Sequence, residues 1–297
     1  MDVAALGELL IDFTDAGLSP SGMRLFERNP GGAPANVAVG AARLGLKAAF
    51  IGKVGSDIHG QFLKQTLENE NVDCRNLILD DEVFTTLAFV QLTAGGEREF
   101  SFSRNQSADV TLSETELDLD LIANSRILHL GTLSMTGESA RSATLKAAAY
   151  AKANGVTVSL DVNYRASLWK KSGDFILAAA ELTPYVTLLK VSEEEAELLG
   201  EPLIFSVPLT VITRGERGAD IYRNGSVTNV PVITAETVVD TTGAGDAFWA
   251  GFLYEYIQNG CGLDNLTGTL AAKAASLCVG KRGAIPALPS LKEVIAE

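Results

Sequence analysis

The spacing of hydrophobic and polar positions divides the second half of the chain into regular units. From residue 126 onward, short apolar runs alternate with longer stretches whose apolar residues recur every three or four positions. The short runs predict β-strands and the longer stretches predict helices. The predicted strands cover 127–130, 156–161, 186–190 and 209–213, and the predicted helices cover 138–154, 174–182 and 193–199. This alternation predicts a mainly parallel sheet with helices on both faces, a three-layer αβα fold.

The first seventy residues and the C-terminal third add further elements. We expect strands over 3–13 and 48–54 and a helix over 58–70. Residues 14–30 contain Gly, Pro, Ser and Asn with little periodicity, and they are expected to be irregular. A hairpin over 220–230, with Asn224-Gly225 at its turn, and a helix over 263–279 complete the predicted elements.

A second hairpin is predicted between the α/β units. Residues 84–92 and 99–102 alternate around Thr93–Arg98, which favours a two-stranded ribbon with a turn at its tip. The ribbon has too little apolar surface to form a domain. We therefore expect one domain over residues 1–297, with a small β-lid built from segments of about 12–30 and 84–104.

The segment 230–257 predicts an anion site. A β-branched apolar run precedes Gly243 and Gly245, and apolar residues recur at helical spacing beyond Asp246. This order favours a strand, a glycine turn and the start of a helix. The first N–H groups of a helix have no partner within it, so Gly243, Ala244 and Gly245 form a candidate anion hole for a phosphate.

Asp246 would lie at the same helix start, one turn from that anion. A carboxylate beside a bound anion is unfavourable for binding alone. It suits a general base that takes a proton from an alcohol attacking phosphorus. We expect the positive end of the helix dipole to keep Asp246 ionised at pH 7. This segment equally allows an aspartate that only stabilises the helix start.

The charge of the chain limits its partners. Twenty-four Lys and Arg stand against 37 Asp and Glu, a net charge of −13, which disfavours nucleic acid and anionic membrane surfaces. No apolar run reaches the ~18 residues of a membrane helix, and the first residues lack the basic region of a signal peptide. Three separated cysteines and two unclustered histidines favour a reduced, cytoplasmic protein without a zinc site.

Two long motifs resemble the signatures of one enzyme family. Residues 31–45 read G-G-A-P-A-N-V-A-V-G-A-A-R-L-G, and residues 240–248 read D-T-T-G-A-G-D-A-F. In this order they are similar to the N- and C-terminal signatures of the ribokinase/PfkB sugar kinases, and the resemblance covers essentially the whole chain. It implies a ribokinase-like fold, with Asp246 as catalytic base and residues 243–245 as the anion hole.

The resemblance also implies a set of sugar ligands near the predicted strand ends and the lid. Asp12 ends the first predicted strand, where ligands of parallel sheets bind. The candidate substrate residues are Asp12, Gly32, Asn36, Phe89, Phe102, Arg104 and Asp246. The alternatives are a loop aspartate at position 12, a plain turn at Gly32, a helix-start residue at Asn36 and a solvated lid residue at Arg104.

Three further motifs are similar to the nucleotide-binding motifs of the family. They are D-x-N-x-R over Asp161–Arg165, K-x-S-x-x-E over Lys190–Glu195, and T-x-G-x-x-G over Thr213–Gly218. The implied ATP ligands are Asn163, Arg165, Lys190, Ser192, Thr213, Gly215, Gly218 and Gly245. Ser192 replaces the usual Asn, a pattern that resembles the fructokinase branch. A structural ion pair between Asp161 and Arg165 is the alternative for those two residues.

The same resemblance implies two cation sites. Glu195 would organise Mg²⁺ through water, although three glutamates at a helix start are also favoured by the helix dipole alone. Asp240, Thr242 and Gly283 would contribute to a loop whose carbonyl oxygens hold a monovalent cation, expected to be K⁺.

Taken together, the motifs imply an ATP-dependent sugar kinase that phosphorylates the primary hydroxyl of a ketohexose, fructose above others, to give fructose 6-phosphate. The alternatives are a 2-keto-3-deoxygluconate kinase in which Arg104 grips the carboxylate, a kinase of another small sugar, and a non-catalytic sugar or nucleotide sensor. An NAD-dependent dehydrogenase would need G-x-G-x-x-G after the first strand, where the chain has Gly7-Glu8-Leu9. A homodimer formed through the lid is a further expectation.

Overall fold

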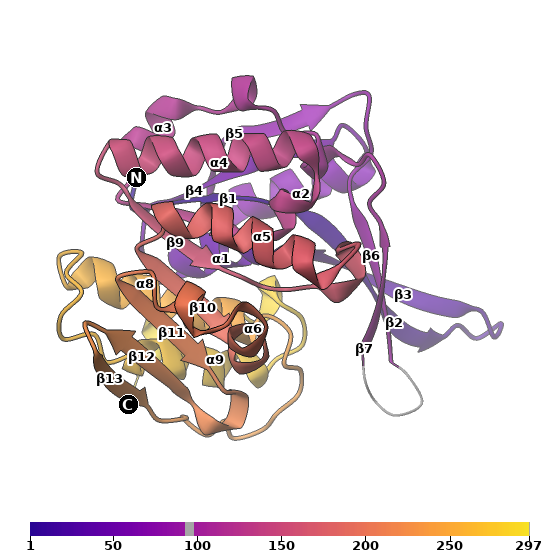
Figure 1. Ribbon diagram of the computed structural model, residues 1–297. Coiled ribbons are helices and arrows are strands. Elements are labelled where there is room, and N and C mark those ends of the chain that lie inside the picture. The colour runs from indigo at the N-terminus through magenta and orange to yellow at the C-terminus, as the bar shows by residue number, and fades with distance from the viewer. Residues whose placement is uncertain (93–97, 297) are drawn as a thin grey trace.

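The computed structural model describes residues 1–92 and 98–296. A nine-stranded sheet runs through the middle of the molecule in the order β13-β12-β11-β10-β9-β8-β1-β4-β5 (Figure 1). The strands are β1 (Val3–Leu6), β4 (Ala48–Gly55), β5 (Asp73–Asp80), β8 (Ile127–Gly131), β9 (Thr157–Asp161), β10 (Leu188–Ser192), β11 (Leu209–Thr213), β12 (Ala219–Arg223) and β13 (Ser226–Val230). Neighbours from β5 to β11 are parallel, and the hairpin β12–β13 is antiparallel.

Helices cover both faces of this sheet. One face packs against α1 (Ala33–Arg43), α2 (Ile58–Asn69), α8 (Ala244–Gln258), α9 (Thr269–Val279) and α10 (Leu291–Ile295). The other packs against α3 (Leu119–Ala123), α4 (Glu138–Ala153), α5 (Ser172–Leu182), α6 (Glu193–Leu199) and α7 (Glu201–Ile204). Along β1, Val3 and Ala5 point into the first core and Ala4 and Leu6 into the second, as the alternation of a strand requires. The predicted three-layer αβα fold is confirmed.

A smaller, four-stranded sheet projects from the body (Figure 1). Its order is β3-β2-β6-β7, with β2 (Leu10–Leu18), β3 (Arg24–Gly31), β6 (Leu87–Leu92) and β7 (Arg98–Ser103). The ribbon predicted over 84–102 is therefore present as β6 and β7, and β2 pairs with β6 in parallel. Residues 93–97, where the hairpin turn was predicted, lie outside the described residues.

Two expectations for the N-terminal region are wrong. The single strand expected over 3–13 is two strands in different sheets, because the chain turns at Gly7–Leu9. A Cβ at Gly7 would lie 2.5 Å from Pro34 Cγ, so this turn needs glycine. Residues 14–30, expected to be irregular, form most of the β2–β3 hairpin, whose backbone pairing supplies the order that its side-chain pattern lacks.

The segment leading to Asp246 also differs from the prediction. β13 ends at Val230, and residues 231–243 form a loop rather than the expected strand. Val238 is 70% exposed, so β-branched residues here do not mark a buried strand. Helix α9 begins at Thr269 rather than at residue 263, because Gly268 takes a left-handed conformation (φ 70°) just before it. Strand β5 was not predicted.

The large sheet positions two helix starts at its carboxyl edge. Helices α1 and α8 pack closely, since a Cβ at Gly40 would lie 2.7 Å from Ala250 Cβ. Trp249, fully buried on α8, donates from Nε1 to Ser159 Oγ on β9 at 2.9 Å. These contacts fix the first turn of α8 above the ends of β9 and β10. None of the helices in the described part of the chain has both the length and the apolar character needed to cross a membrane.

Candidate active site

Helix α8 begins at a glycine that no other residue could replace without strain. Gly243 is left-handed (φ 78°), and a Cβ there would lie 2.9 Å from Ala284 Cα. The helix starts immediately afterwards at Ala244, so the N–H groups of its first turn lack partners within the helix. The structure thus places Gly243, Ala244 and Gly245 at a helix N-terminus, as predicted, with Asp246 in the same turn.

Asp246 is nearly buried, with 8% of its surface exposed. Its Oδ2 accepts a hydrogen bond from Asn36 Nδ2 at 2.7 Å, which joins the two helix starts. Burial, reinforced by the negative charge of Asp161, raises the pKa of Asp246 to about 6, while Asn36, Lys190 and Arg165 act in the opposite direction. Burial is the largest influence on this carboxyl, and it acts against the ionisation that was expected from the helix start. At pH 7 the group is still mostly ionised, and a pKa near the working pH suits a general base.

A buried cation lies directly below this helix start. Lys190 Nζ and Asp161 Oδ2 are 2.7 Å apart, with side-chain exposures of 8% and 2%. A Cβ at Gly245 would lie 3.4 Å from Lys190 Nζ, which places the ammonium against the candidate anion hole. Burial alone would lower the pKa of Lys190, but Asp161, Glu195 and Asp246 raise it. Asp161 is thus paired with Lys190 rather than with Arg165, the pairing considered from the sequence.

The candidate nucleotide residues follow the ends of adjacent strands. Ser192 caps α6, and Glu195 completes the capping box by accepting from Ser192 N at 2.7 Å. The other oxygen of Glu195 accepts from Tyr164 N at 2.6 Å, and burial raises the pKa of Glu195. The carboxylate therefore links the loop after β9 to α6. In that loop, Asn163 is left-handed (φ 49°) and Arg165 donates to Tyr164 O at 3.0 Å.

The turn after β11 carries the third nucleotide motif. Thr213 Oγ1 donates to Val191 O at 3.3 Å, which ties the end of β11 to β10. Gly215 and Gly218 both have positive φ, and a Cβ at Gly218 would lie 2.2 Å from Val230 O. The three motifs thus meet along the ends of β9, β10 and β11.

The candidate monovalent-cation loop is held together by one carboxylate. Asp240 Oδ1 accepts from Thr242 N at 2.9 Å and from Thr242 Oγ1 at 2.8 Å. Asp240 Oδ2 accepts from Gly283 N at 3.0 Å, so the predicted segments are adjacent although 43 residues separate them. Within residues 1–92 and 98–296, no group of three His, Cys, Asp or Glu side chains could hold a metal. A cation here would therefore depend on carbonyl oxygens.

The candidate sugar residues gather at the start of α1 and on the small sheet. The Asp12 carboxylate lies against the backbone of Gly31, since a Cβ there would meet Asp12 Oδ2 at 2.1 Å. Gly32 follows with φ 113°, and Asn36 completes the first turn. On the small sheet, Phe89 is 38% exposed and stacks on Phe13 at 5.3 Å between centroids. Phe102 pairs in register with Ala88 on β6.

Arg104 is placed differently from a solvated lid residue. Its side chain is 5% exposed and forms an ion pair with Asp109 at 2.7 Å. The guanidinium also donates to Thr136 Oγ1 at 2.5 Å and to Leu133 O at 2.9 Å. Every nitrogen of the group thus has a partner within the protein. A direct contact with the sugar stays a prediction, and the visible role of Arg104 is to anchor the end of β7 to the body.

Glu8, for which no motif in the sequence predicts a role, lies in the same region. Glu8 is 2% exposed and accepts from Ala33 N, at the start of α1, at 3.0 Å. Burial raises its pKa to about 7, with Arg104 as the neighbouring cation. The available signal was its position two residues after the end of β1, at the carboxyl edge of a parallel sheet.

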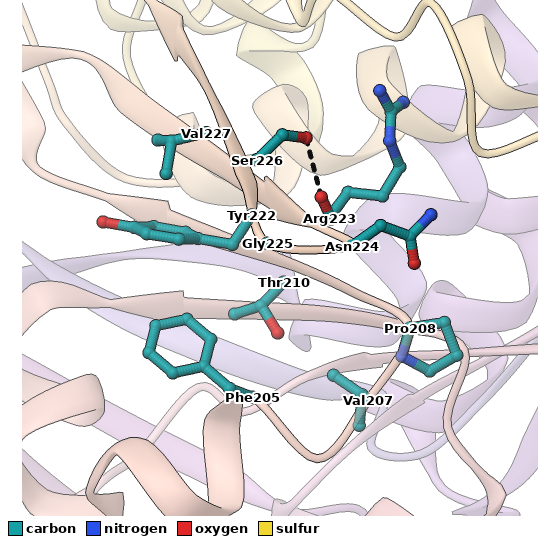
Figure 2. Close-up of a pocket in the computed structure, with 10 residues that line it drawn as sticks. All are labelled: Phe205, Val207, Pro208, Thr210, Tyr222, Arg223, Asn224, Gly225, Ser226 and Val227. Atoms are coloured by element: carbon teal, nitrogen blue, oxygen red, sulfur yellow. Dashed lines mark hydrogen bonds between the residues drawn. The ribbon is translucent and has the colours of Figure 1, made fainter.

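A surface pocket of about 300 Å³ lies elsewhere (Figure 2). Phe205 and Tyr222 form its aromatic side, and Arg223, Asn224 and Ser226 come from the β12–β13 hairpin. Arg223 pairs with Leu209, the first residue of β11, so this pocket is at the opposite edge of the sheet from the candidate residues. The catalytic candidates are not part of it.

Comparison with known proteins agrees with this geometry. The description "pfkB family carbohydrate kinase" applies to a family model that matches residues 1–291. The chain is 42% identical to the probable fructokinase-6, chloroplastic, of Arabidopsis thaliana, over 99% of this chain and 81% of that protein.

Solved structures show the same architecture. An uncharacterized sugar kinase of Pyrococcus horikoshii in complex with ATP is 35% identical, with a TM-score of 0.88 over 98% of this chain and 96% of that one. A fructokinase double mutant of Vibrio cholerae, bound to fructose, ADP and a potassium ion, is 31% identical, with a TM-score of 0.87 over 99% and 96%. With a family match over almost its whole length, the chain belongs to the pfkB family of carbohydrate kinases.

Proposed function

We propose that the protein is an ATP-dependent fructokinase that transfers the γ-phosphoryl group to the primary hydroxyl of fructose. The observation that carries this proposal is Asp246, a buried carboxyl with a pKa of about 6 in the same helix turn as an anion hole. An attacking alcohol and a phosphate are the two groups that such a site would bring together. The Arabidopsis relative is named as a fructokinase, and the Vibrio cholerae structure holds fructose.

In this mechanism Asp246 accepts the proton of the sugar hydroxyl as the oxygen attacks the γ-phosphorus. Asn36 holds the carboxylate by its Oδ2, which leaves Oδ1 for the hydroxyl. Negative charge grows on the transferred and leaving oxygens, and the N–H groups at the start of α8 and the ammonium of Lys190 stabilise it. The bond from oxygen to phosphorus forms while the bond to ADP breaks, and ADP leaves with its negative charge.

ATP, Mg²⁺ and K⁺ are the proposed cofactors. The proposed ATP contacts are Asn163, Arg165, Lys190, Ser192, Thr213, Gly215, Gly218 and Gly245. A putative ribokinase II of E. coli holds ATP and Mg²⁺. The site fits a hydrated cation, because Asp161 Oδ1 is buried without a partner among the described residues and Glu195 lies beside it. When bound, Mg²⁺ neutralises charge on the phosphates.

The monovalent ion and the sugar are proposed to bind at opposite sides of Asp246. The loop joined by Asp240 would hold K⁺, with Thr242 and Gly283 as further ligands. Asp12, Gly32, Asn36, Phe89, Phe102 and Arg104 are the proposed sugar residues, with Arg104 acting in part through Asp109. The small sheet would close over the sugar and exclude water. We also propose a single domain over residues 1–297.

We further propose a cytoplasmic enzyme that dimerises through the small sheet. The support for the dimer is that Leu18, Met23, Leu25 and Phe26 on the β2–β3 hairpin are 44–67% exposed. Such a set of large apolar side chains is typical of an interface. Sedimentation of the purified protein, compared with a Met23→Asp variant, tests this point.

The substrate is tested by a coupled ADP-release assay on fructose, ribose, 2-keto-3-deoxygluconate, adenosine and fructose phosphates. We expect fructose to have the highest kcat/KM. A preference for 2-keto-3-deoxygluconate would overturn the fructose assignment. The structure gives that acid little support, because the guanidinium of Arg104 is already paired with Asp109.

A further inference from the structure

A buried carboxyl group that the mechanism above does not use lies at the start of α1. Glu8 Oε1 accepts from Ala33 N at 3.0 Å, which fixes the side chain against the first turn of the helix. The backbones of Glu8 and Gly32 are also in close contact, because a Cβ at Gly32 would lie 2.3 Å from the carbonyl oxygen of Glu8. Glu8 therefore has a defined position beside two of the proposed sugar residues, Gly32 and Asn36.

The second oxygen of this carboxyl group lacks a donor. Among the residues that the structure describes, Glu8 Oε2 is buried without a hydrogen-bond partner, and so is Asn36 Oδ1 in the same turn of α1. Buried acceptors are almost always satisfied in folded proteins, because an unpaired one is costly. Two of them at one helix start indicate a ligand that supplies hydrogen-bond donors.

The charges around this position favour a neutral ligand. The Asp12 carboxylate lies on Gly31, two residues before the Ala33 N–H that Glu8 contacts. Arg104 is the neighbouring cation, and Asp109 already neutralises it at 2.7 Å. A carboxylate or phosphate on the ligand would therefore face the acidic side chain of Glu8, whose neighbouring cation, Arg104, is already paired. Hydroxyl groups supply donors without adding negative charge.

We propose that Glu8 determines the substrate specificity of the kinase: its Oε2 forms a hydrogen bond with a sugar hydroxyl, and an acidic group at this position disfavours sugar acids and sugar phosphates. This inference rests on the proposed function and deepens it, because it names the group that selects a neutral sugar at the same site. Glu8 is not a proton acceptor in the reaction, a role that stays with Asp246.

The first test is Glu8→Gln, which keeps an oxygen for Ala33 N and nearly the same volume but replaces Oε2 by an amide nitrogen that cannot accept a hydrogen bond. We expect the KM for fructose to rise about tenfold or more, as for a lost hydrogen bond to a charged group. The KM for ATP should stay within about twofold, because Glu8 lies on the sugar side. The fructose kcat/KM should fall relative to that of 2-keto-3-deoxygluconate.

A matched control comes from a glutamate with a similar structural role. Glu255, nine residues beyond Asp246 on α8, accepts from Gly268 N at 2.9 Å and Leu270 N at 2.5 Å, where α9 begins. Glu255→Gln removes the same charge from the same kind of helix-start contact. It should leave the KM for fructose unchanged. An equal rise in both variants would show that Glu8 acts only through folding, which would overturn the proposal.

The second test uses fructose analogues that each lack one hydroxyl. For the analogue without the hydroxyl that Glu8 contacts, wild type and Glu8→Gln should have the same KM. If the ratio of the Glu8→Gln KM to the wild-type KM is the same for every analogue in the series, the proposal is overturned. If Glu8→Gln does not fold, Glu8→Asp, which withdraws the carboxylate by one carbon, replaces it with the same expected pattern. Wild-type KM values that are equal for fructose and every analogue would also overturn it.

Failure of the proposed function would be visible separately. If wild type does not phosphorylate fructose but accepts another neutral sugar, the fructose assignment is wrong, and the analogue series is made from that sugar. If wild type prefers a sugar acid, both the fructose assignment and the role of Glu8 in selecting neutral substrates are wrong.

Discussion

Replacing Asp246 by Asn separates the chemistry of this residue from its contribution to stability. The substitution keeps the size of the side chain, and the amide oxygen can still accept from Asn36 Nδ2. It removes the group that takes the proton. General-base catalysis contributes about 10²–10⁴-fold to a rate, so kcat should fall by at least about a hundredfold. ATP binding should change little, because the N–H groups of residues 243–245 are untouched.

The same substitution should stabilise the fold. Asp246 has a pKa of about 6 in the folded protein against an ordinary value of 3.8, so the folded state binds its proton more tightly than the unfolded state does. Ionisation of Asp246 therefore does not destabilise the fold below pH 3.8. The destabilisation grows as the pH rises from 3.8 to 6 and reaches its full value above pH 6. At about 1.4 kcal/mol per pKa unit, the cost at pH 7 is about 3 kcal/mol. Asp246→Asn removes that cost, so Tm should rise.

Two measurements check this reasoning. A coupled assay at saturating ATP and fructose gives kcat, and thermal melts at pH 7 and pH 4.5 give the change in stability. The gain in Tm should be larger at pH 7, where the wild-type carboxylate is ionised, than at pH 4.5. Retention of more than about a tenth of wild-type kcat would refute the base assignment. A lower Tm at pH 7 would refute the claim that burial dominates the pKa.

Three further outcomes follow from the site. Wild-type kcat/KM should fall as the pH drops below about 6, where Asp246 takes up a proton, and a profile flat to pH 5 would contradict this. Activity should rise when Na⁺ is exchanged for K⁺ at constant ionic strength, because carbonyl oxygens near Asp240 and Gly283 are proposed to hold the ion; equal rates in both salts would count against the site. Arg104→Ala should lower the free energy of unfolding by about 3–5 kcal/mol, since it leaves the buried carboxylate of Asp109 without its counter-charge. Urea melts measure this loss, and Arg104→Lys should recover part of it.

The sequence predicted the elements whose burial follows a simple period. The regular units from β8 to β11 match within a few residues, because each strand there is buried on both faces and each helix has one apolar side. The β2–β3 hairpin could not be predicted in this way, since its order comes from backbone pairing with β6. Over residues 231–243 the error was the reverse, since a strand was predicted where the structure has a loop. Val238 and Val239 are exposed there despite their β-branched side chains.

The candidate site was predictable where a motif fixes the backbone, and less so where tertiary contacts decide. Gly243–Asp246 lie at a helix start, as the glycines required. The partner of Asp161 could not be read from the sequence, because Lys190 reaches it from the neighbouring strand, 29 residues away. The buried ion pair of Arg104 and the position of Glu8 likewise depend on packing between segments that no local pattern connects.

The connections between the two sheets give the enzyme a mechanical property. The chain enters the small sheet through Gly7–Leu9, between β1 and β2, and returns to the body through Gly32, between β3 and α1. The Glu8 carbonyl lies against the backbone of Gly32, so these two crossings form one joint. Rotation of the small sheet would bend the chain there and at its two other crossings, before β6 and after β7, and would carry Asp12 away while Asn36 and Asp246 stay with the body. Such an opening would separate one side of the proposed sugar site from the other, so the product would lose part of its contacts in the same movement that clears its exit.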